Sequence, residues 1–418
     1  MNKSLKVLYP VDAVHAMATP VFDVVIVGGS LTGLLAAREI AKAGKSIAIL
    51  EEHFDIGLPE KCDGLVTKRA LAELGIIPSA SSLQAYIKKA TFKSPSGFEL
   101  EIDAGHQGVV VLDRSILDKQ LGLEAAKLGA EIRVGERVLG MRRKNGFFAV
   151  SSQKQTYRCE IAIDCRGSSS YLRQRAKGIL PAGKYEVRGD WIDAERVEVH
   201  FNNQVTPGFF TWVIPTGNKT AKVGAAGNGI SPFSVLDSFL NKRRSAIMRK
   251  ITAPILVGGP LQNFSLNGII MAGEAAGQSK PTTAGGIYSA GMGGLLAGQA
   301  IVSHLNRTEP RALLAYQKRW QRIFGGEFRR MAKLRRIFEQ LTNDEIDRLL
   351  HIIAESSVLK KISLDTDFDF HTLNLARNLG SRGLIGIAAL VARSGLRDFF
   401  PRTGRSDPLN STNNRKWQ

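Results

Sequence analysis

The stretch from Val24 to Glu52, VVIVGGSLTGLLAAREIAKAGKSIAILEE, limits the folds open to this chain more than any other. Val24–Val27 is a short apolar run that ends at glycines, which is typical of a buried parallel strand. Helical spacing follows over Leu34–Ala43 and stops at a glycine, and Ser46–Leu50 reads as a second strand. The order of strand, helix and strand predicts a βαβ unit, and hence an α/β fold with a parallel sheet.

The turn between the first strand and the helix resembles the G-x-G-x-x-G turn of dinucleotide-binding proteins, with Gly28, Ser30 and Gly33 at its three positions. The first glycine allows the tight turn, and the third allows the helix to pack closely on the strand. Ser30 replaces the glycine that lets backbone approach a pyrophosphate, but serine is small and its hydroxyl can donate to a phosphate oxygen. We expect the helix N-terminus, at Leu31 and Thr32, to face the anion.

Two acidic residues follow the second strand. Glu51 can bind both hydroxyls of an adenosine ribose, and its charge disfavours a 2′-phosphate. Glu52 is a second candidate contact to the cofactor. A glycine pattern alone is weak, but strand, glycines, helix, strand and acid in this order predict a working dinucleotide site.

Later stretches favour FAD over NAD as the dinucleotide. VLDRSILDKQL places Arg114 and Asp118 one helical turn apart after a strand, and we expect Arg114 to contact the cofactor. IIMAGEAAGQSKPTTAGGIYSAGMGGLLAG predicts a strand, then Gly273 and Glu274, then a loop that enters a helix. A carboxylate in this place can hold the ribityl chain of a flavin. The alternative is a glycine-rich loop that serves packing only.

The helix after that loop begins at the residues Gly285, Gly286 and Ile287. Its N-terminus can stabilise negative charge at the N1–C2 carbonyl edge of a flavin. The segment Pro281–Asn306 contains no Asp, Glu, Lys or Arg and is long enough to span a bilayer. Because it is rich in glycine and serine, we expect a loop running into a buried helix rather than a membrane span.

The rest of the chain predicts a second sheet and a helical end. The length of 418 residues exceeds what one hydrophobic core usually spans. Tyr86–Phe92 and Phe98–Ile102 flank a turn and predict a hairpin, and Val187–Ala226 is strand-like. Helical periodicity follows over Arg311–Phe324, Glu327–Leu341 and Asp344–Ser356, the last with a capping box of Thr342 and Glu345.

We therefore expect a Rossmann-type FAD-binding domain interrupted by an antiparallel β-sheet domain that binds the substrate, with a C-terminal helical region. The expected ranges are 1–20 for an N-terminal extension, 21–80, 105–180 and 265–305 for the FAD-binding domain, 81–104 and 181–264 for the substrate-binding sheet, and 306–418 for the helical region.

Charge and cysteine content point to a cytoplasmic protein with anionic partners. The net charge of +19 favours membrane lipid, nucleic acid or phosphorylated small molecules. No helix-turn-helix or zinc spacing supports nucleic acid, and the seven scattered histidines suggest no metal site. Leu240–Lys250, Phe328–Phe338 and the stretch GLIGIAALVARSGLRDFF are candidates for peripheral membrane contact. Three cysteines form no disulfide framework, which favours a reducing compartment.

Three stretches over roughly residues 21–305 resemble the geranylgeranyl reductase family, whose FAD fold is that of the p-hydroxybenzoate hydroxylase class. GLPEKCDGLVTK is similar to the G-x-P-x-x-C-x-x-G segment of that family, FFTWVIPTG to its Y-x-W-x-F-P motif, and AGEAAGQSKPTTAGGI to its G-D-A-A…P-x-x-G-G-G-I loop. The chain departs from the family pattern at four positions. Ser30 replaces a glycine, Glu274 replaces an aspartate and Phe210 replaces a tyrosine. Arg166 replaces the aspartate of an Asp-Gly pair.

The resemblance implies an enzyme that reduces carbon–carbon double bonds of an isoprenoid lipid by hydride transfer from reduced flavin. It implies that Cys62 lies near the isoalloxazine ring as a catalytic group. Lys61 and Tyr288 are candidate proton donors. The sequence does not identify the electron donor, so NAD(P)H and ferredoxin both stay open. The plainer alternative for Cys62 is a small buried thiol.

Phe210, Trp212 and Ile214 alternate along a strand and therefore point to one face, which can line a lipid tunnel. The alternative is that they belong to an ordinary sheet core. Two other function classes stay open: a flavin monooxygenase or halogenase of the same fold, and a non-enzymatic basic binding protein that keeps a flavin fold.

Overall fold

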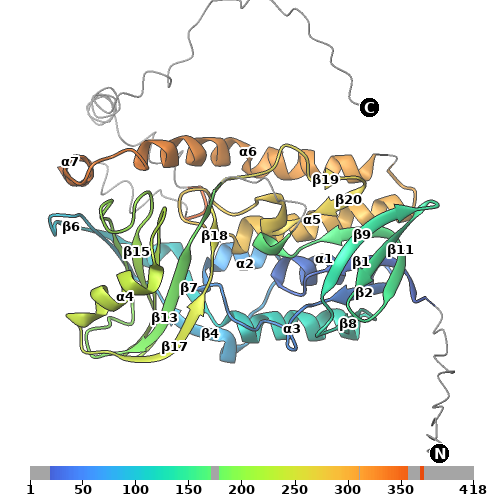
Figure 1. The fold of residues 1–418 in the computed structure, drawn as a ribbon, viewed down its shortest axis with the longest axis horizontal. Helices are drawn as coiled ribbons and strands as arrows, with labels where there is room; N and C mark the ends of the chain where they lie inside the picture. The colour runs from blue at the N-terminus through green and yellow to red at the C-terminus, as the bar shows by residue number, and fades with distance from the viewer. Residues whose placement is uncertain (1–18, 171–177, 310, 356–367, 371–418) are drawn as a thin grey trace, which may run out of the picture.

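The computed structural model describes residues 19–170, 178–309, 311–355 and 368–370. Figure 1 shows a mainly parallel sheet with its helices on the right, an antiparallel sheet on the left, and the long helix α6 lying across the top of both. The expected N-terminal extension falls almost wholly outside the described residues, as does the stretch GLIGIAALVARSGLRDFF.

The first sheet has the strand order β19-β20-β11-β1-β2-β8, with β10 and β9 added beside β11. β1 pairs in parallel with β2 and with β11, so the predicted βαβ unit is present. The strands are β1 (Val21–Val27), β2 (Ile47–Leu50), β8 (Glu131–Arg133), β9 (Val138–Lys144), β10 (Phe147–Ser152), β11 (Thr156–Asp164), β19 (Ser265–Leu266) and β20 (Ile269–Met271).

Helices α1 (Leu31–Lys42) and α5 (Ile287–Leu305) pack against each other, and their apolar side chains share one core. Glycines of α5 make the contact close. A Cβ at Gly294 would lie 2.2 Å from the Thr32 carbonyl oxygen, and one at Gly298 would lie 2.8 Å from the Ala36 carbonyl oxygen. The uncharged segment is thus a buried helix, as expected. None of the helices in the described residues combines the length and apolar character needed to cross a bilayer.

The second sheet has the order β17-β13-β16-β15-β14-β5-β6, and every neighbouring pair is antiparallel except β14 with β5. A third sheet has the order β3-β7-β4, and β12 pairs with β18. The strands are β3 (Leu65–Thr67), β4 (Leu83–Tyr86), β5 (Lys89–Lys93), β6 (Glu99–Asp103), β7 (Val109–Leu112), β12 (Ile179–Leu180), β13 (Ala182–Arg188), β14 (Arg196–His200), β15 (Thr211–Gly217), β16 (Thr220–Ala226), β17 (Ala246–Thr252) and β18 (Ile255–Leu256).

The remaining helices are α2 (Lys68–Glu73), α3 (Arg114–Lys127), α4 (Pro232–Asn241), α6 (Ala312–Phe338) and α7 (Asn343–Glu355). The prediction of two separate helices over Arg311–Phe324 and Glu327–Leu341 was wrong, because α6 is one helix that continues through Gly325 and Gly326. Trp320, Phe324 and Phe328 are almost fully buried at four-residue spacing. Their burial outweighs the cost of about 1 kcal/mol for each helical glycine.

Two further predictions were wrong in detail. The predicted hairpin is present as β5 and β6, but its first arm begins at Lys89 rather than at Tyr86, because β4 ends at Tyr86 in the three-stranded sheet. Leu240–Lys250, which mixes basic and apolar residues as an interfacial helix would, is not a helix. α4 ends at Asn241 and β17 follows as an edge strand, where exposed basic side chains are common. The capping box is confirmed, with Thr342 N donating to Glu345 Oε2 at 2.9 Å.

Candidate functional site

A single cavity of about 1220 Å³ is lined by both large sheets and by the C-terminal helices. One part, which we call the cofactor arm, is lined by the loops at the carboxyl ends of β1, β2, β11 and β20 and by the N-termini of α1 and α5. The other part, the apolar arm, is lined mainly by hydrophobic side chains. Its walls include Ile87, Ala90, Phe92, Leu100, Ile102, Val197, Val199, Phe201, Leu334, Ile337, Phe338, Leu341, Ile346, Leu349, Leu350 and Ile353.

The glycine turn forms the start of the cofactor arm. Gly28 has φ +107°, and a Cβ there would lie 2.7 Å from the Cys165 carbonyl oxygen, so the turn requires glycine. Gly33 lies beneath the turn rather than in the cavity wall, since its Cβ would be 2.1 Å from the Gly28 carbonyl oxygen. Ser30, the N-cap of α1, is exposed and lines the cavity together with Leu31 and Thr32. It leaves the helix N-terminus without a side-chain cap.

Glu51 and Glu52 line the same arm. Glu51 accepts the Gly29 N–H at 2.7 Å through Oε2, and its Oε1 lies 2.6 Å from His53 Nδ1. These contacts fix the carboxylate beside the glycine turn, and a carboxylate has further lone pairs for ribose hydroxyls. Glu52 is exposed, with Oε2 at 3.7 Å from Arg137 Nε.

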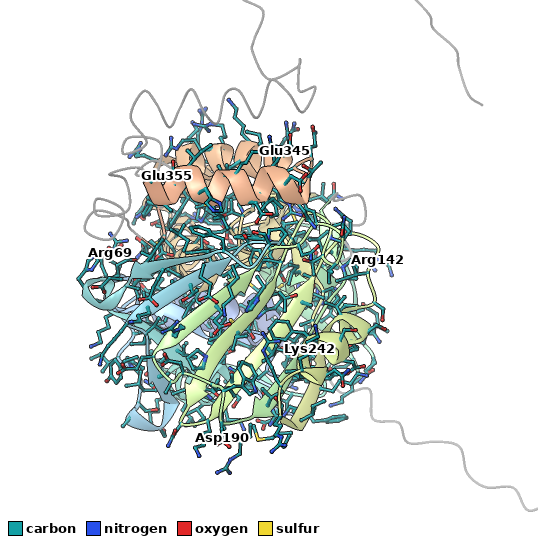
Figure 2. The ribbon with its side chains drawn as sticks, turned by 90° about the vertical axis from the view of Figure 1, so that its left-hand side faces the viewer. Arg69, Arg142, Asp190, Lys242, Glu345 and Glu355 are labelled. Atoms are coloured by element: carbon teal, nitrogen blue, oxygen red, sulfur yellow. The ribbon has the colours of Figure 1, made fainter. Side chains whose placement is uncertain are left out.

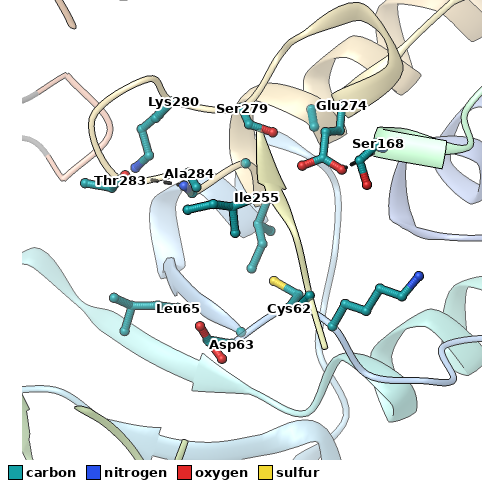
Figure 3. A pocket seen from close by; sticks show the side chains of 18 of the residues that line it. Cys62, Asp63, Leu65, Ser168, Ile255, Glu274, Ser279, Lys280, Thr283 and Ala284 are labelled. Carbon is teal, nitrogen blue, oxygen red and sulfur yellow. Dashed lines mark hydrogen bonds between the residues drawn. The ribbon is translucent and has the colours of Figure 1, made fainter. Parts of the chain in front are cut away.

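The opposite wall of the cofactor arm is formed by Glu274 and the start of α5. Glu274 Oε2 accepts the Ser168 N–H at 3.0 Å, and the two residues face each other in Figure 3. Gly286 is the N-cap of α5 without a side-chain cap, and it lines the cavity with Gly285 and Ile287. Gly273 does not line the cavity; it is buried where a Cβ would lie 2.5 Å from Thr32 Oγ1.

Arg166 departs from the family pattern, and the structure shows its immediate surroundings. Its Nη2 donates to the buried Asp164 at 2.7 Å and its Nε at 3.0 Å. Ser170 Oγ donates to the same carboxylate at 2.7 Å. The guanidinium is therefore folded back onto the end of β11, while the residue still lines the cofactor arm.

Arg114 is buried at the N-terminus of α3 and lines the cavity. Its Nη2 donates to Asp118 Oδ1 at 2.8 Å, so the predicted one-turn spacing does pair the two residues. Burial alone would lower the pKa of Arg114, but the Asp118 carboxylate beside it raises the pKa overall. The guanidinium therefore remains a fixed positive charge beside the cofactor arm.

Cys62 lines the cavity with its neighbour Lys61, and Figure 3 shows it across the open space from Glu274, Ser279 and Lys280. Its backbone carbonyl accepts from Lys184 Nζ at 2.9 Å. Cys62 is half-buried, whereas the other two cysteines are buried. In Figure 3 the apolar side chains of Leu65 and Ile255 lie on one side of Cys62 and Glu274 lies on the other, and we call this part of the wall the junction of the two arms.

Phe210, Trp212 and Ile214 all line the cavity, as their alternation predicts. They also belong to one apolar cluster beneath the antiparallel sheet. Trp212 has a second contact, because its Nε1 donates to Asp63 Oδ2 at 2.9 Å. Trp212 therefore links the sheet to the segment that carries Cys62.

Tyr288 is not among the described residues that line the cavity. Its hydroxyl donates a hydrogen bond to Glu73, and its ring packs edge-on against Phe324. Burial, reinforced by the hydrogen bond to Glu73, raises the pKa of Tyr288 above its ordinary value. These surroundings do not favour Tyr288 as a proton donor in the cavity.

Several wall residues were missed by the sequence analysis. Lys280 is buried in the loop between Glu274 and α5, with Nζ 3.2 Å from Asp369 Oδ1 and 4.2 Å from the ring centre of Phe368. α7 closes the apolar arm from above; Figure 2 shows it crossing the end of the antiparallel sheet, with Glu345 and Glu355 near its ends. No local motif signals these contacts, because each joins residues far apart in the sequence.

The cofactor arm fits FAD by the chemistry of its donors. Two uncapped helix N-termini, those of α1 and α5, open into it, and carboxylates stand beside each at Glu51 and Glu274. The helix ends suit a pyrophosphate and the electron-rich edge of a flavin, and the carboxylates suit hydroxyl groups. Gly28 leaves room where a side chain would meet backbone.

Comparison with known proteins agrees with this geometry. Residues 21–245 match the family model described as an FAD binding domain. The chain is 29% identical to a digeranylgeranylglycerophospholipid reductase of Methanothrix thermoacetophila over 81% of this chain and 93% of the relative. It is 30% identical to digeranylgeranylglycerophospholipid reductase 2 of Methanothermobacter thermautotrophicus over 82% of this chain and 95% of the relative.

Solved structures share the fold. A geranylgeranyl bacteriochlorophyll reductase-like protein from Thermoplasma acidophilum superposes with a TM-score of 0.78, at 22% identity over 90% of this chain and all of the other. A flavin-dependent brominase superposes with a TM-score of 0.65, at 16% identity over 90% of this chain and 99% of the other. The expected fold class is confirmed.

Proposed function

Because the chain belongs to the geranylgeranyl reductase family of FAD-dependent oxidoreductases, we propose that it reduces carbon–carbon double bonds of a geranylgeranyl-type isoprenoid lipid. The observation that carries this proposal is the continuity of the cavity. The walls suited to FAD and the long apolar arm belong to one space of about 1220 Å³. An extended hydrocarbon in the apolar arm can therefore reach the cofactor without passing through water.

When bound, reduced FAD supplies a hydride for an alkene carbon. The residues of the chain hold, orient and enclose the reactants. We assign the pyrophosphate to the N-terminus of α1 with Ser30, the adenosine ribose to Glu51, and the ribityl chain to Glu274. The N-terminus of α5 and Arg114 add positive potential beside the cofactor.

On the substrate side, we assign Phe210, Trp212 and Ile214 to contacts with the isoprenoid chain, because they line the cavity from β15 and from the residue just before it. Their apolar surface excludes water from the reacting carbons. Cys62 is the proposed catalytic group, since it stands where the two arms meet. The proton that completes the reduction goes to the carbon next to the one that accepts the hydride.

The test is product analysis under anaerobic conditions. The purified protein, loaded with FAD and reduced with dithionite, is mixed with geranylgeranyl lipid, and the product is analysed by mass spectrometry. We expect a mass gain of two hydrogens for each double bond reduced, together with reoxidation of the flavin spectrum. Dithionite avoids the choice between NAD(P)H and ferredoxin as donor.

A second arm of this experiment, run in air and with halide, distinguishes the alternative of a monooxygenase or halogenase. In air, with halide present, those enzymes would insert oxygen or halogen into the product instead of hydrogen. A protein that stays colourless after incubation with FAD would contradict both proposals. It would favour the third class, a basic binding protein without redox chemistry.

We also propose that the outer face of α6 meets an anionic membrane surface from which the lipid enters. Lys318, Arg322, Arg329, Lys333 and Arg336 are exposed at spacings of three, four or seven residues, and we call them the α6 stripe. The inner face of the same helix lines the apolar arm through Leu334, Ile337 and Phe338. A cationic face directly above the lipid cavity complements anionic head groups.

Reversing three charges of the stripe, in Arg322→Glu/Arg329→Glu/Lys333→Glu, is expected to weaken binding to vesicles. Each basic residue near an anionic surface contributes about 1 kcal/mol, so the loss should be at least about 100-fold. Co-sedimentation with vesicles containing phosphatidylglycerol measures it. The matched control, Arg142→Glu/Arg143→Glu/Lys144→Glu on exposed positions of β9, changes the net charge equally. Equal losses in both triple variants would show that net charge, and not the α6 stripe, governs binding.

A further inference from the structure

The segment that carries Cys62 is held by two buried lysines of the antiparallel sheet. We call residues Gly57–Gly64 the Cys62 segment. Lys184 on β13 and Lys222 on β16 are each only 1% exposed. In the strand register Lys184 is opposite Gly224, two residues along from Lys222, so both ammonium groups leave the same face of the sheet.

Lys184 donates hydrogen bonds to two atoms of the Cys62 segment. Its Nζ lies 2.9 Å from the Cys62 carbonyl oxygen and 3.1 Å from Asp63 Oδ1. The other carboxylate oxygen of Asp63 accepts from Trp212 Nε1 at 2.9 Å. Lys184, Gly224 and Trp212 lie in one row across three strands, and the absence of a side chain at Gly224 leaves room for the indole ring. The side chains of Lys184 and Trp212 therefore both bind the Asp63 carboxylate.

Lys222 binds the same segment on the N-terminal side of Cys62, at Glu60. Its Nζ lies 2.8 Å from Glu60 Oε1, and Glu60 is 4% exposed. The same oxygen accepts the backbone N–H of Arg114 at 2.8 Å. Glu60 thus ties the Cys62 segment both to the antiparallel sheet and to the start of α3.

The ends of the segment are fixed independently. Gly57 and Gly64 both have positive φ, and a Cβ at Gly64 would lie 1.9 Å from the Leu112 carbonyl oxygen. The ends therefore pack directly on the backbone of neighbouring elements. The lysine contacts act on the middle of the segment, which includes Cys62.

Stability alone is a poor explanation for these charges. Removing ions from water costs several kcal/mol each, and an apolar pair of the same volume often stabilises a fold as well or better. Directional contacts to a backbone carbonyl and two carboxylates do what apolar packing cannot, which is to fix one orientation of a loop. We propose that Lys184 and Lys222 are positioning residues that hold the Cys62 thiol at the junction of the two cavity arms.

The direct test measures how exposed and mobile the thiol is. Cys62 is alkylated with iodoacetamide in the FAD-loaded protein, and the adduct is mapped by mass spectrometry over time. The other cysteines are suited as internal references, since burial raises the pKa of Cys159 to about 12 and raises that of Cys165 well above its usual range. This readout requires no substrate, so it stands even if the proposed reaction is wrong.

We expect Lys184→Met and Lys222→Met to change the alkylation rate of Cys62 by about 10-fold, because a segment released by 1 Å no longer presents the thiol in one place. Turnover of lipid, which rests on the proposed function, should lose about 10- to 100-fold in kcat with a smaller change in KM. The matched control is Lys219→Met, which removes an exposed pair with Asp190 at 2.7 Å on the same sheet. It should leave both values unchanged.

If the lysine variants do not fold, a more conservative substitution tests the same segment. Trp212→Phe keeps an aromatic ring but removes the indole N–H to Asp63, and it should shift the alkylation rate in the same direction. Variants that fold, bind FAD and react at Cys62 at the wild-type rate would overturn the proposal. So would a loss of melting temperature in all of them without any change in Cys62 reactivity, which would indicate a role in stability only.

Discussion

Gly33→Ala is expected to lower FAD affinity by about 100-fold or more, because a displacement of roughly 1 Å at a binding site can cost this much. The new Cβ would stand 2.1 Å from the Gly28 carbonyl oxygen, a backbone atom that cannot move without changing the turn. Either α1 or the turn must shift, and both form the N-terminal site assigned to the pyrophosphate. The FAD-to-protein absorbance ratio and the quenching of flavin fluorescence on titration measure the loss.

The control for this substitution is Gly140→Ala. Gly140 lies on β9, with no atom within 4 Å of a Cβ placed there, so this variant should bind FAD as the wild type does. If Gly33→Ala kept its FAD and its melting temperature, the close packing of α1 on the turn would not govern the cofactor site. The contribution assigned to the glycine turn would then be wrong.

The elements of the fold that could be predicted are those whose sequence signal comes from residues close together in the chain. The βαβ unit follows from Val24–Val27, the glycine turn and the helix behind it, and each depends on neighbours in the sequence. The alternation of Phe210, Trp212 and Ile214 likewise predicted one face, and the three residues do line one cavity. Periodicity carries this information because side-chain direction repeats regularly along a strand.

The unpredictable part depends on pairing across long sequence distances. Lys184 and Lys222 stand in strands where alternation alone suggests ordinary sheet residues, and only the register shows that both face the Cys62 segment. A lysine inside an apolar strand was the only local signal. The helix α6 was divided wrongly at Gly325 because the burial of Trp320 and Phe324, which keeps it intact, depends on tertiary packing.

Ala90→Trp is expected to block the apolar arm and so to lower the reduction of long lipid substrates. Ala90 lies between Ile102 and Val197 in one row of the antiparallel sheet, and all three line the cavity. An indole in this row would fill space that a long chain must occupy. Overpacking of this kind costs about 1–3 kcal/mol, so kcat/KM for geranylgeranyl lipid should fall roughly 10- to 100-fold.

The effect of Ala90→Trp should depend on chain length, which separates a blocked path from a damaged fold. Reduction of a geranyl substrate should be less affected, FAD binding should be unchanged, and Ala90→Val should be intermediate. Ala246→Trp is the control, since Ala246 is exposed on the edge strand β17 and lines no part of the cavity. Equal losses for short and long substrates in Ala90→Trp would mean that the chain does not follow the apolar arm past Ala90, and the substrate assignment would have to move to another wall.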